Sequence, residues 1–150
     1  RDPKYWEFRE LTPQAWKKFF PECQVILVEV APPNGVPSGS WAKIARYMAA
    51  ARFTDDVCLI HDIDTVPLQR DYTVNILSQR KAGHLLCVGA EVYAGTPHEG
   101  KFPAGHMTGE GRLFGQLLEG YAPGLPDMFD SKEDVRSTHF SDESMIRAQL

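Results

Sequence analysis

The sequence has no apolar run that approaches the roughly 20 residues of a membrane-spanning helix. It also has no excess of basic charge, because 16 Lys and Arg stand against 20 Asp and Glu and give a net charge of −4. Binding to nucleic acid or to an anionic membrane therefore has no general electrostatic basis. Cysteine is scarce and lacks the Cys-x-x-Cys spacing of a metal site: Cys23, Cys58 and Cys87. We expect buried, reduced thiols in a soluble domain in the cytoplasm of the producing or host cell.

The 150 residues are 43% hydrophobic and 24% charged, as in an ordinary globular domain with a real core. Apolar periodicity, helix caps and Pro or Gly breaks predict helices over 12–20, 41–53, 72–80 and 112–119, and a last helix from Ser141. Strands are predicted over 24–30, 57–60 and 84–93. This alternation favours an α/β fold, in which helices flank a central, mostly parallel mixed sheet.

Two acids follow the apolar strand 57–60, at Asp62 and Asp64. Because side chains alternate along a strand, both carboxylates are expected on one side, with Cα atoms about 6.6 Å apart. Two oxygen ligands at this spacing suit Mg²⁺ or Mn²⁺. The same acids are also common turn formers, and Pro67 nearby favours a turn.

The helix before this strand carries Lys43, Arg46 and Tyr47 three and four residues apart, so these side chains share one face. The two cations could face a carboxylate pair or a diphosphate. They could equally form a solvated surface stripe.

Ala45-Arg46-Tyr47 on a helix, followed by a hydrophobic strand that ends in His61-Asp62-Ile63-Asp64, resembles the core of GT-A-fold glycosyltransferases. The chain is also similar to glycosyltransferase domains encoded by large algal DNA viruses. The resemblance implies a GT-A-like, Rossmann-related fold, with Mn²⁺ or Mg²⁺ held by Asp62 and Asp64 against the diphosphate of a nucleotide sugar. It also implies that Lys43 and Arg46 lie at the donor site.

Later segments resemble the same family in the same order. Residues 102–107 resemble a stretch at which glycine lets a sugar approach the backbone, so Gly105 and His106 are expected in the donor site. Residues 139–144 resemble the acidic helix start that lines the sugar pocket. Asp142 and Glu143 are therefore the candidate catalytic acids, although they could be ordinary helix-start acids. Weaker candidates are Glu91, Glu99 and Glu110, and a further metal ligand is sought in His106 or His139.

These features predict a glycosyltransferase that moves a sugar from a UDP-sugar donor to a glycan or other hydroxyl acceptor, with a divalent cation. The alternatives are a nucleotidyltransferase that forms nucleotide sugars and a non-catalytic carbohydrate-binding module. The glycine-rich stretch 95–111 is interpreted as a mobile wall of the acceptor site. We expect residues 1–150 to be one catalytic domain, an excerpt without the first strand and the C-terminal end of the family.

Overall fold

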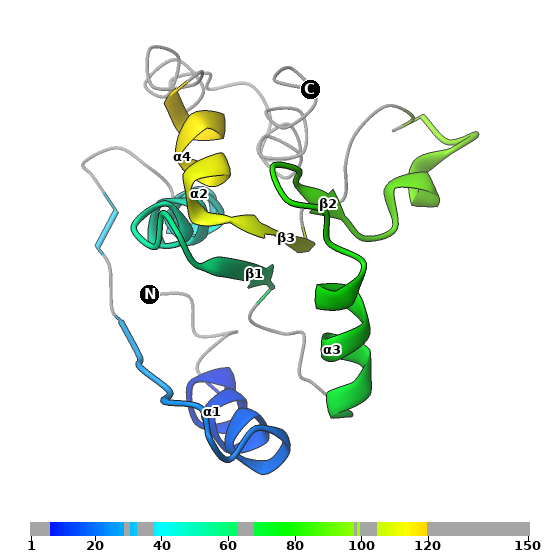
Figure 1. Ribbon diagram of the computed structural model, residues 1–150. Coiled ribbons are helices and arrows are strands. Elements are labelled where there is room, and N and C mark those ends of the chain that lie inside the picture. Colours follow the sequence, from blue (N-terminus) through cyan, green and yellow to red (C-terminus); the bar gives the residue numbers. More distant parts are fainter. Residues whose placement is uncertain are drawn as a thin grey trace.

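The computed structural model describes residues 7–28, 31–32, 38–62, 68–97, 99 and 105–119. Helices and strands alternate irregularly along these residues (Figure 1). In chain order they are α1 (Phe8–Phe19), α2 (Ser38–Ala51), β1 (Val57–His61), α3 (Arg70–Ser78), β2 (Leu86–Cys87), the 3₁₀-helix η2 (Ala90–Tyr93), β3 (His106–Glu110) and α4 (Gly111–Glu119).

The described strands form one sheet in the order β1-β3-β2, and both pairings are antiparallel. Ile60 lies opposite Met107, and Leu86 lies opposite Thr108. The predicted mostly parallel, GT-A-like sheet is therefore wrong. The reason is β3: the stretch 95–111, predicted as a wall of the acceptor site, contains the central strand of the sheet. Because β3 lies between β1 and β2 and runs opposite to both, no two neighbouring strands of this sheet are parallel.

Two predicted strands are also corrected. Residues 24–28 belong to no strand, and the side chains of Ile26, Leu27 and Val28 are 67%, 59% and 76% exposed. The strand predicted over 84–93 is reduced to Leu86–Cys87. Gly89 then adopts a left-handed conformation with φ 77°, and the chain turns into η2. A left-handed residue interrupts the extended path that a longer strand needs.

The helices agree better with the sequence. The helices predicted over 41–53, 72–80 and 112–119 are confirmed as α2, α3 and α4, with ends shifted by at most two or three residues. The first helix begins at Phe8 rather than at the predicted Thr12-Pro13 start, and Pro13 lies inside it. Proline removes one backbone donor but leaves this helix intact, so the Pro signal marked the wrong position.

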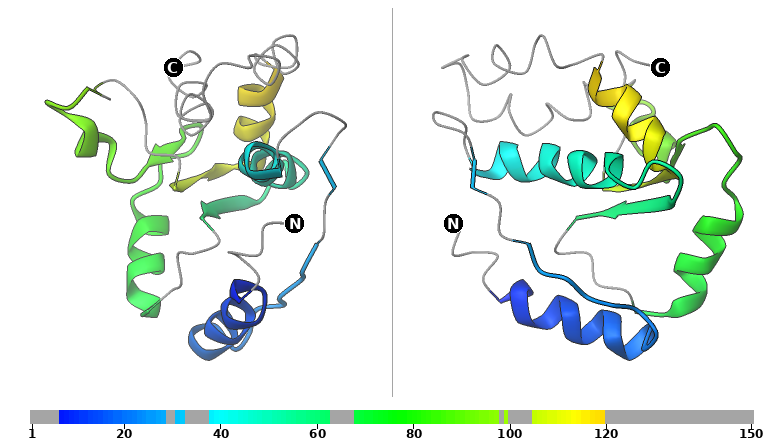
Figure 2. Two further views of the ribbon diagram at one scale, coloured as in Figure 1. Left: turned by 180° about the vertical axis from the view of Figure 1, so that it is seen from behind. Right: turned by 60° about the vertical axis from the view of Figure 1, so that its left-hand side comes forward.

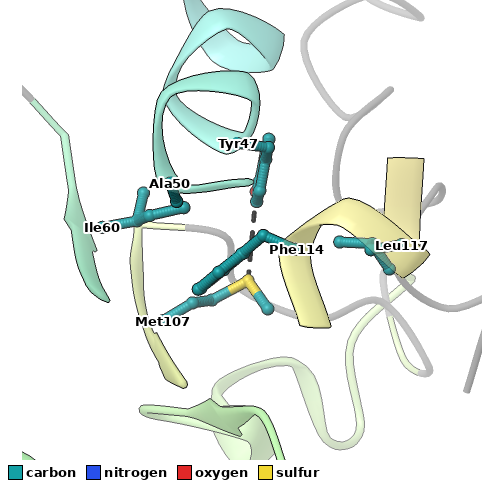
Figure 3. Packing of buried hydrophobic residues seen from close by; sticks show 6 residues of the cluster. All are labelled: Tyr47, Ala50, Ile60, Met107, Phe114 and Leu117. Atoms are coloured by element: carbon teal, nitrogen blue, oxygen red, sulfur yellow. Dashed lines mark hydrogen bonds between the residues drawn. The ribbon is translucent and has the colours of Figure 1, made fainter. Parts of the chain in front are cut away.

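The core lies between the sheet and the pair α2 and α4, which cover the same face (Figure 2). Tyr47 is fully buried, and its hydroxyl donates a 3.9 Å hydrogen bond to Met107 Sδ. Its ring lies 6.2 Å from that of Phe114, measured between centroids. Figure 3 shows these three side chains packed with Ala50, Ile60 and Leu117. The core therefore ties α2 to β1 and β3, and fixes the residues at the end of this strand pair.

Candidate functional site

The candidate site lies where β1 ends and β3 begins. His61 and His106 are direct partners across the two strands, and Asp62 follows immediately. The backbone N–H of Asp62 donates a 3.3 Å hydrogen bond to the carbonyl of Gly105. The pairing of β1 with β3 therefore brings together four residues from segments more than 40 positions apart.

Arg46 reaches this strand end from α2. Its guanidinium Nη1 forms an ion pair with Asp62 Oδ1, and the two side chains are 15% and 49% exposed. Arg46 Nε donates a 3.2 Å bond to the carbonyl of Lys43, and the guanidinium lies 5.3 Å from the ring centroid of Tyr47. Since Tyr47 is buried in the core, its contact with the guanidinium restricts the side chain of Arg46 to few conformations.

Of the two cations predicted to share one face of this helix, the structure places Arg46 at the strand end. Arg46 lies against the first acid of the Asp-x-Asp pattern. Lys43 is half-buried and contributes its backbone carbonyl to Arg46.

Gly105 lies beside the Asp62 carboxylate. A Cβ atom built on Gly105 would come within 2.8 Å of Asp62 Oδ2. The resemblance had suggested that this glycine admits a sugar to the backbone. In the structure it leaves room for a carboxylate, so a side chain at position 105 would displace Asp62.

The two histidines form an aromatic cluster next to Asp62. Their ring centroids are 4.6 Å apart, at an interplanar angle of 83°. Trp16 of α1 contacts His61 at 5.8 Å, and Tyr72 of α3 contacts His106 at 6.2 Å. In the described part of the chain, neither nitrogen of His61 has a hydrogen-bond partner, and the same holds for His106 Nε2.

Burial has the largest effect on the pKa of both imidazoles. It lowers the pKa of His61 to about 4, helped by the charge of His106 and opposed by Asp62. Burial also lowers the pKa of His106; Asp62 opposes this and Arg46 adds to it. Both rings are therefore neutral at pH 7, and a neutral imidazole nitrogen can accept a hydrogen bond or bind a metal.

Two of the three weaker acidic candidates, Glu110 and Glu99, have other partners in the structure. Glu110 pairs with Arg80 at 3.1 Å and with Arg112 at 3.3 Å, and it accepts a 3.0 Å bond from the N–H of Gly83. Glu99 accepts a 3.2 Å bond from the N–H of Gly95. These contacts give Glu110 a structural role, joining β3 to the turn after α3.

Several predicted site residues lie outside the described residues: Asp64, His139, Asp142 and Glu143. Across the ranges that the structure describes, no group of three or more His, Cys, Asp or Glu is placed to hold a metal ion. The described part of the site thus supplies one carboxylate, from Asp62, and two neutral imidazoles.

Sequence reasoning overlooked His61, Trp16 and Tyr72. His61 is adjacent to Asp62, but its position beside His106 depends on the β1–β3 pairing, for which the sequence carried no signal. The expectation of buried cysteines is wrong for Cys23, which is exposed, whereas Cys58 and Cys87 are half-buried.

No protein-family model matches the chain, and no curated protein or solved structure matches it. Among the described helices, none is long and apolar enough to cross a membrane.

Proposed function

We propose that this chain is a divalent-metal-dependent glycosyltransferase that moves a sugar from a UDP-sugar donor to a hydroxyl of a glycan acceptor. The observation that carries the proposal is the ion pair between Arg46, on helix α2, and Asp62, at the end of β1. The ion pair places a fixed cation next to the first acid of Asp62-x-Asp64. A bound diphosphate is stabilised both by a metal ion held on such acids and by nearby positive charge. An antiparallel sheet does not argue against this chemistry, since function depends on the site rather than on the fold.

The residue types at the strand end would suit a divalent cation. Carboxylate oxygens and imidazole nitrogens are both ligands of Mn²⁺. Asp62 and Asp64 would hold the ion, and His106 would add a nitrogen ligand, because its buried Nε2 has no hydrogen-bond partner in the described residues. When bound, the ion would neutralise the charge that develops on the departing diphosphate.

The remaining roles belong to the protein's own side chains. Arg46 adds fixed positive charge beside the diphosphate and orients the Asp62 carboxylate. The neutral His61 and His106 add no competing charge. Asp142 or Glu143 would take the proton of the acceptor hydroxyl, as an inverting reaction requires.

The test measures UDP binding by calorimetry, with Mn²⁺, with Mg²⁺ and with chelator, followed by UDP release from a panel of UDP-sugars. We expect metal-dependent UDP binding that Asp62→Asn abolishes, because the amide keeps the shape of the carboxylate and loses its charge. Asp55→Asn is the matched control, since Asp55 is an exposed acid at the other end of β1.

Unchanged UDP affinity in Asp62→Asn would contradict the proposed site. Saccharide binding without any UDP release would indicate a binding module. Formation of a nucleotide sugar from UTP and a sugar phosphate would indicate a nucleotidyltransferase.

A further inference from the structure

A hollow of about 340 Å³ lies between α3 and the segment that leads from β2 into η2. This volume is at the small end of the roughly 300–1,000 Å³ of ligand pockets, so it suits a small ligand or one unit of a larger one. One wall is formed by a single face of α3, with Tyr72, Asn75 and Ile76, and by its C-cap residue Gln79. These residues are spaced by three and four, as one helix face requires. The opposite wall is the segment 86–89 together with Glu91.

The chemistry of the lining favours a neutral, hydroxyl-rich ligand. Asn75 and Gln79 each carry an amide with two donors and an acceptor, and both side chains are exposed. Glu91 adds a carboxylate acceptor, whereas no Lys, Arg or His is among the described residues that line the hollow. A phosphate or carboxylate would find no positive charge here and would be repelled by Glu91. Ile76 supplies an apolar floor for the C–H face of a ring.

The hollow adjoins the candidate site. Tyr72 is part of its lining and also contacts the His106 ring edge-on, at 6.2 Å between centroids. On the opposite wall, the N–H of Val88 donates a 3.0 Å hydrogen bond to the carbonyl of His106. Both walls therefore contact His106. His106 pairs with His61, and His61 directly precedes Asp62.

We propose that this hollow binds a neutral saccharide unit of the acceptor, with the amides of Asn75 and Gln79 hydrogen-bonding its hydroxyls. The saccharide-binding site stands on the lining itself, and its role as acceptor site rests on the proposed function. Tyr72 lines the hollow and contacts the ring of His106, and His106 pairs with His61 at the strand end that carries Asp62, so the hollow lies beside the proposed donor site.

The experiment separates saccharide binding from donor chemistry. Methyl glycosides of glucose, galactose, mannose and N-acetylglucosamine are titrated at millimolar concentration into the chain without donor, and backbone amide resonances are followed by NMR. We expect at least one glycoside to shift the resonances of residues 72–79 and of residues 86–91. Asn75→Leu and Gln79→Leu should each lower the affinity for that glycoside about tenfold, because each removes hydrogen bonds to the ligand. Affinity for UDP with Mn²⁺ should stay unchanged in both variants.

Gln69→Leu is the matched control: it makes the same kind of change at an exposed position outside the hollow, and its side chain makes no capping bond to α3. It should leave glycoside binding intact. Glycoside binding that depends on Asn75 and Gln79 without any UDP release supports the saccharide site and contradicts the proposed transfer. UDP release with no glycoside effect at 72–79, or with binding unchanged in both leucine variants, overturns the inference and leaves the proposed function standing.

Discussion

At the residue scale, the contact that matters most is the one between Arg46 and Asp62. Arg46 is positioned by the buried Tyr47 and by the carbonyl of Lys43, so its guanidinium is directed at the strand end before any ligand binds. A preorganised cation costs less to place at a developing negative charge than a flexible one. The aromatic contact and the ion pair together explain why an Arg, rather than a Lys, occupies this position.

Arg46→Lys keeps the charge but loses the planar fork that pairs with carboxylate or phosphate oxygens. We expect kcat/KM for the donor to fall about tenfold, and Arg46→Ala to lower it further. Steady-state kinetics with a UDP-sugar and Mn²⁺ measures both. Arg52→Lys, at an exposed residue just after α2, is the control and should leave the rate unchanged. If Arg46→Ala also leaves donor kinetics unchanged, Arg46 has only a structural role.

Gly105→Ala tests the position of the Asp62 carboxylate. The added methyl group would come within 2.8 Å of Oδ2, and the exposed carboxylate can move away at little cost in stability. We therefore expect weaker Mn²⁺-dependent UDP binding with nearly unchanged unfolding free energy. Gly39→Ala, where an added Cβ meets nothing within 4 Å, should leave UDP binding unchanged and, because Gly39 lies in α2, stabilise the protein slightly. A large loss of stability in Gly105→Ala with intact UDP binding would count against this assignment.

At the scale of elements, the junction of β3 with α4 is fastened to the turn between α2 and β1. The N–H of Gly111 donates a 3.0 Å bond to the carbonyl of Asp56, and that of Arg112 a 3.1 Å bond to Thr54. A Cβ on Gly111 would collide with the carbonyl oxygens of Ala50 and Phe53. These are backbone atoms, so they cannot move aside as a side chain would.

Gly111→Ala should therefore destabilise the protein by about 1–3 kcal/mol, as overpacking commonly does. Gly115→Ala in the same helix is the contrasting variant, because its Cβ would make only an ordinary 3.8 Å contact with Ala51. Alanine at that position should stabilise α4 by up to about 1 kcal/mol. Denaturant unfolding of both variants gives the comparison, and equal effects at the two positions would refute the close packing at Gly111.

The sequence predicted the elements whose signals are local. The helix over 41–53 and the strand over 57–60 were found from apolar periodicity and capping, which need only neighbouring residues. The strand β3 was missed because His106–Glu110 contains a glycine, is largely polar and follows a glycine-rich stretch. Its pairing with β1 bridges almost fifty positions, and no local pattern encodes such a contact. Because β3 was not predicted, neither the antiparallel sheet nor the His61–His106 pair could be predicted.

At the scale of the whole molecule, the candidate site is assembled from both sides of the sheet. Arg46 comes from α2, on the face that α4 also covers, and Trp16 comes from α1, which lies on the other side (Figure 2). Tyr72 comes from α3. Arg46 and Asp62 could be predicted as a pair because the resemblance to GT-A-fold glycosyltransferases links the helix residue to the acid. The aromatic surround of the two histidines depends on how separate helices pack, and no motif predicts it.

The packing around His61 should make the free energy of unfolding depend on pH. His61 is held neutral by burial, which lowers its folded pKa to about 4, while its unfolded value is near 6.5. Between these values the unfolded chain binds a proton that the folded chain does not, so the free energy of unfolding should fall as pH drops from 6.5 towards 4. Below about 4 this residue causes no further loss. His106, with its lowered pKa, acts in the same direction.

Melting temperatures measured from pH 7.5 to pH 4, with chelator present, test this. His61→Phe keeps an aromatic ring between Trp16 and His106 and removes the titrating group, so it should lose part of the pH dependence below 6.5. His84→Phe is the control, because His84 is exposed and should leave the curve unchanged. If His61→Phe follows the wild-type profile across this range, the acid sensitivity does not come from the buried histidine, and His61 must take up its proton without disturbing the packing of α1 against the strand end.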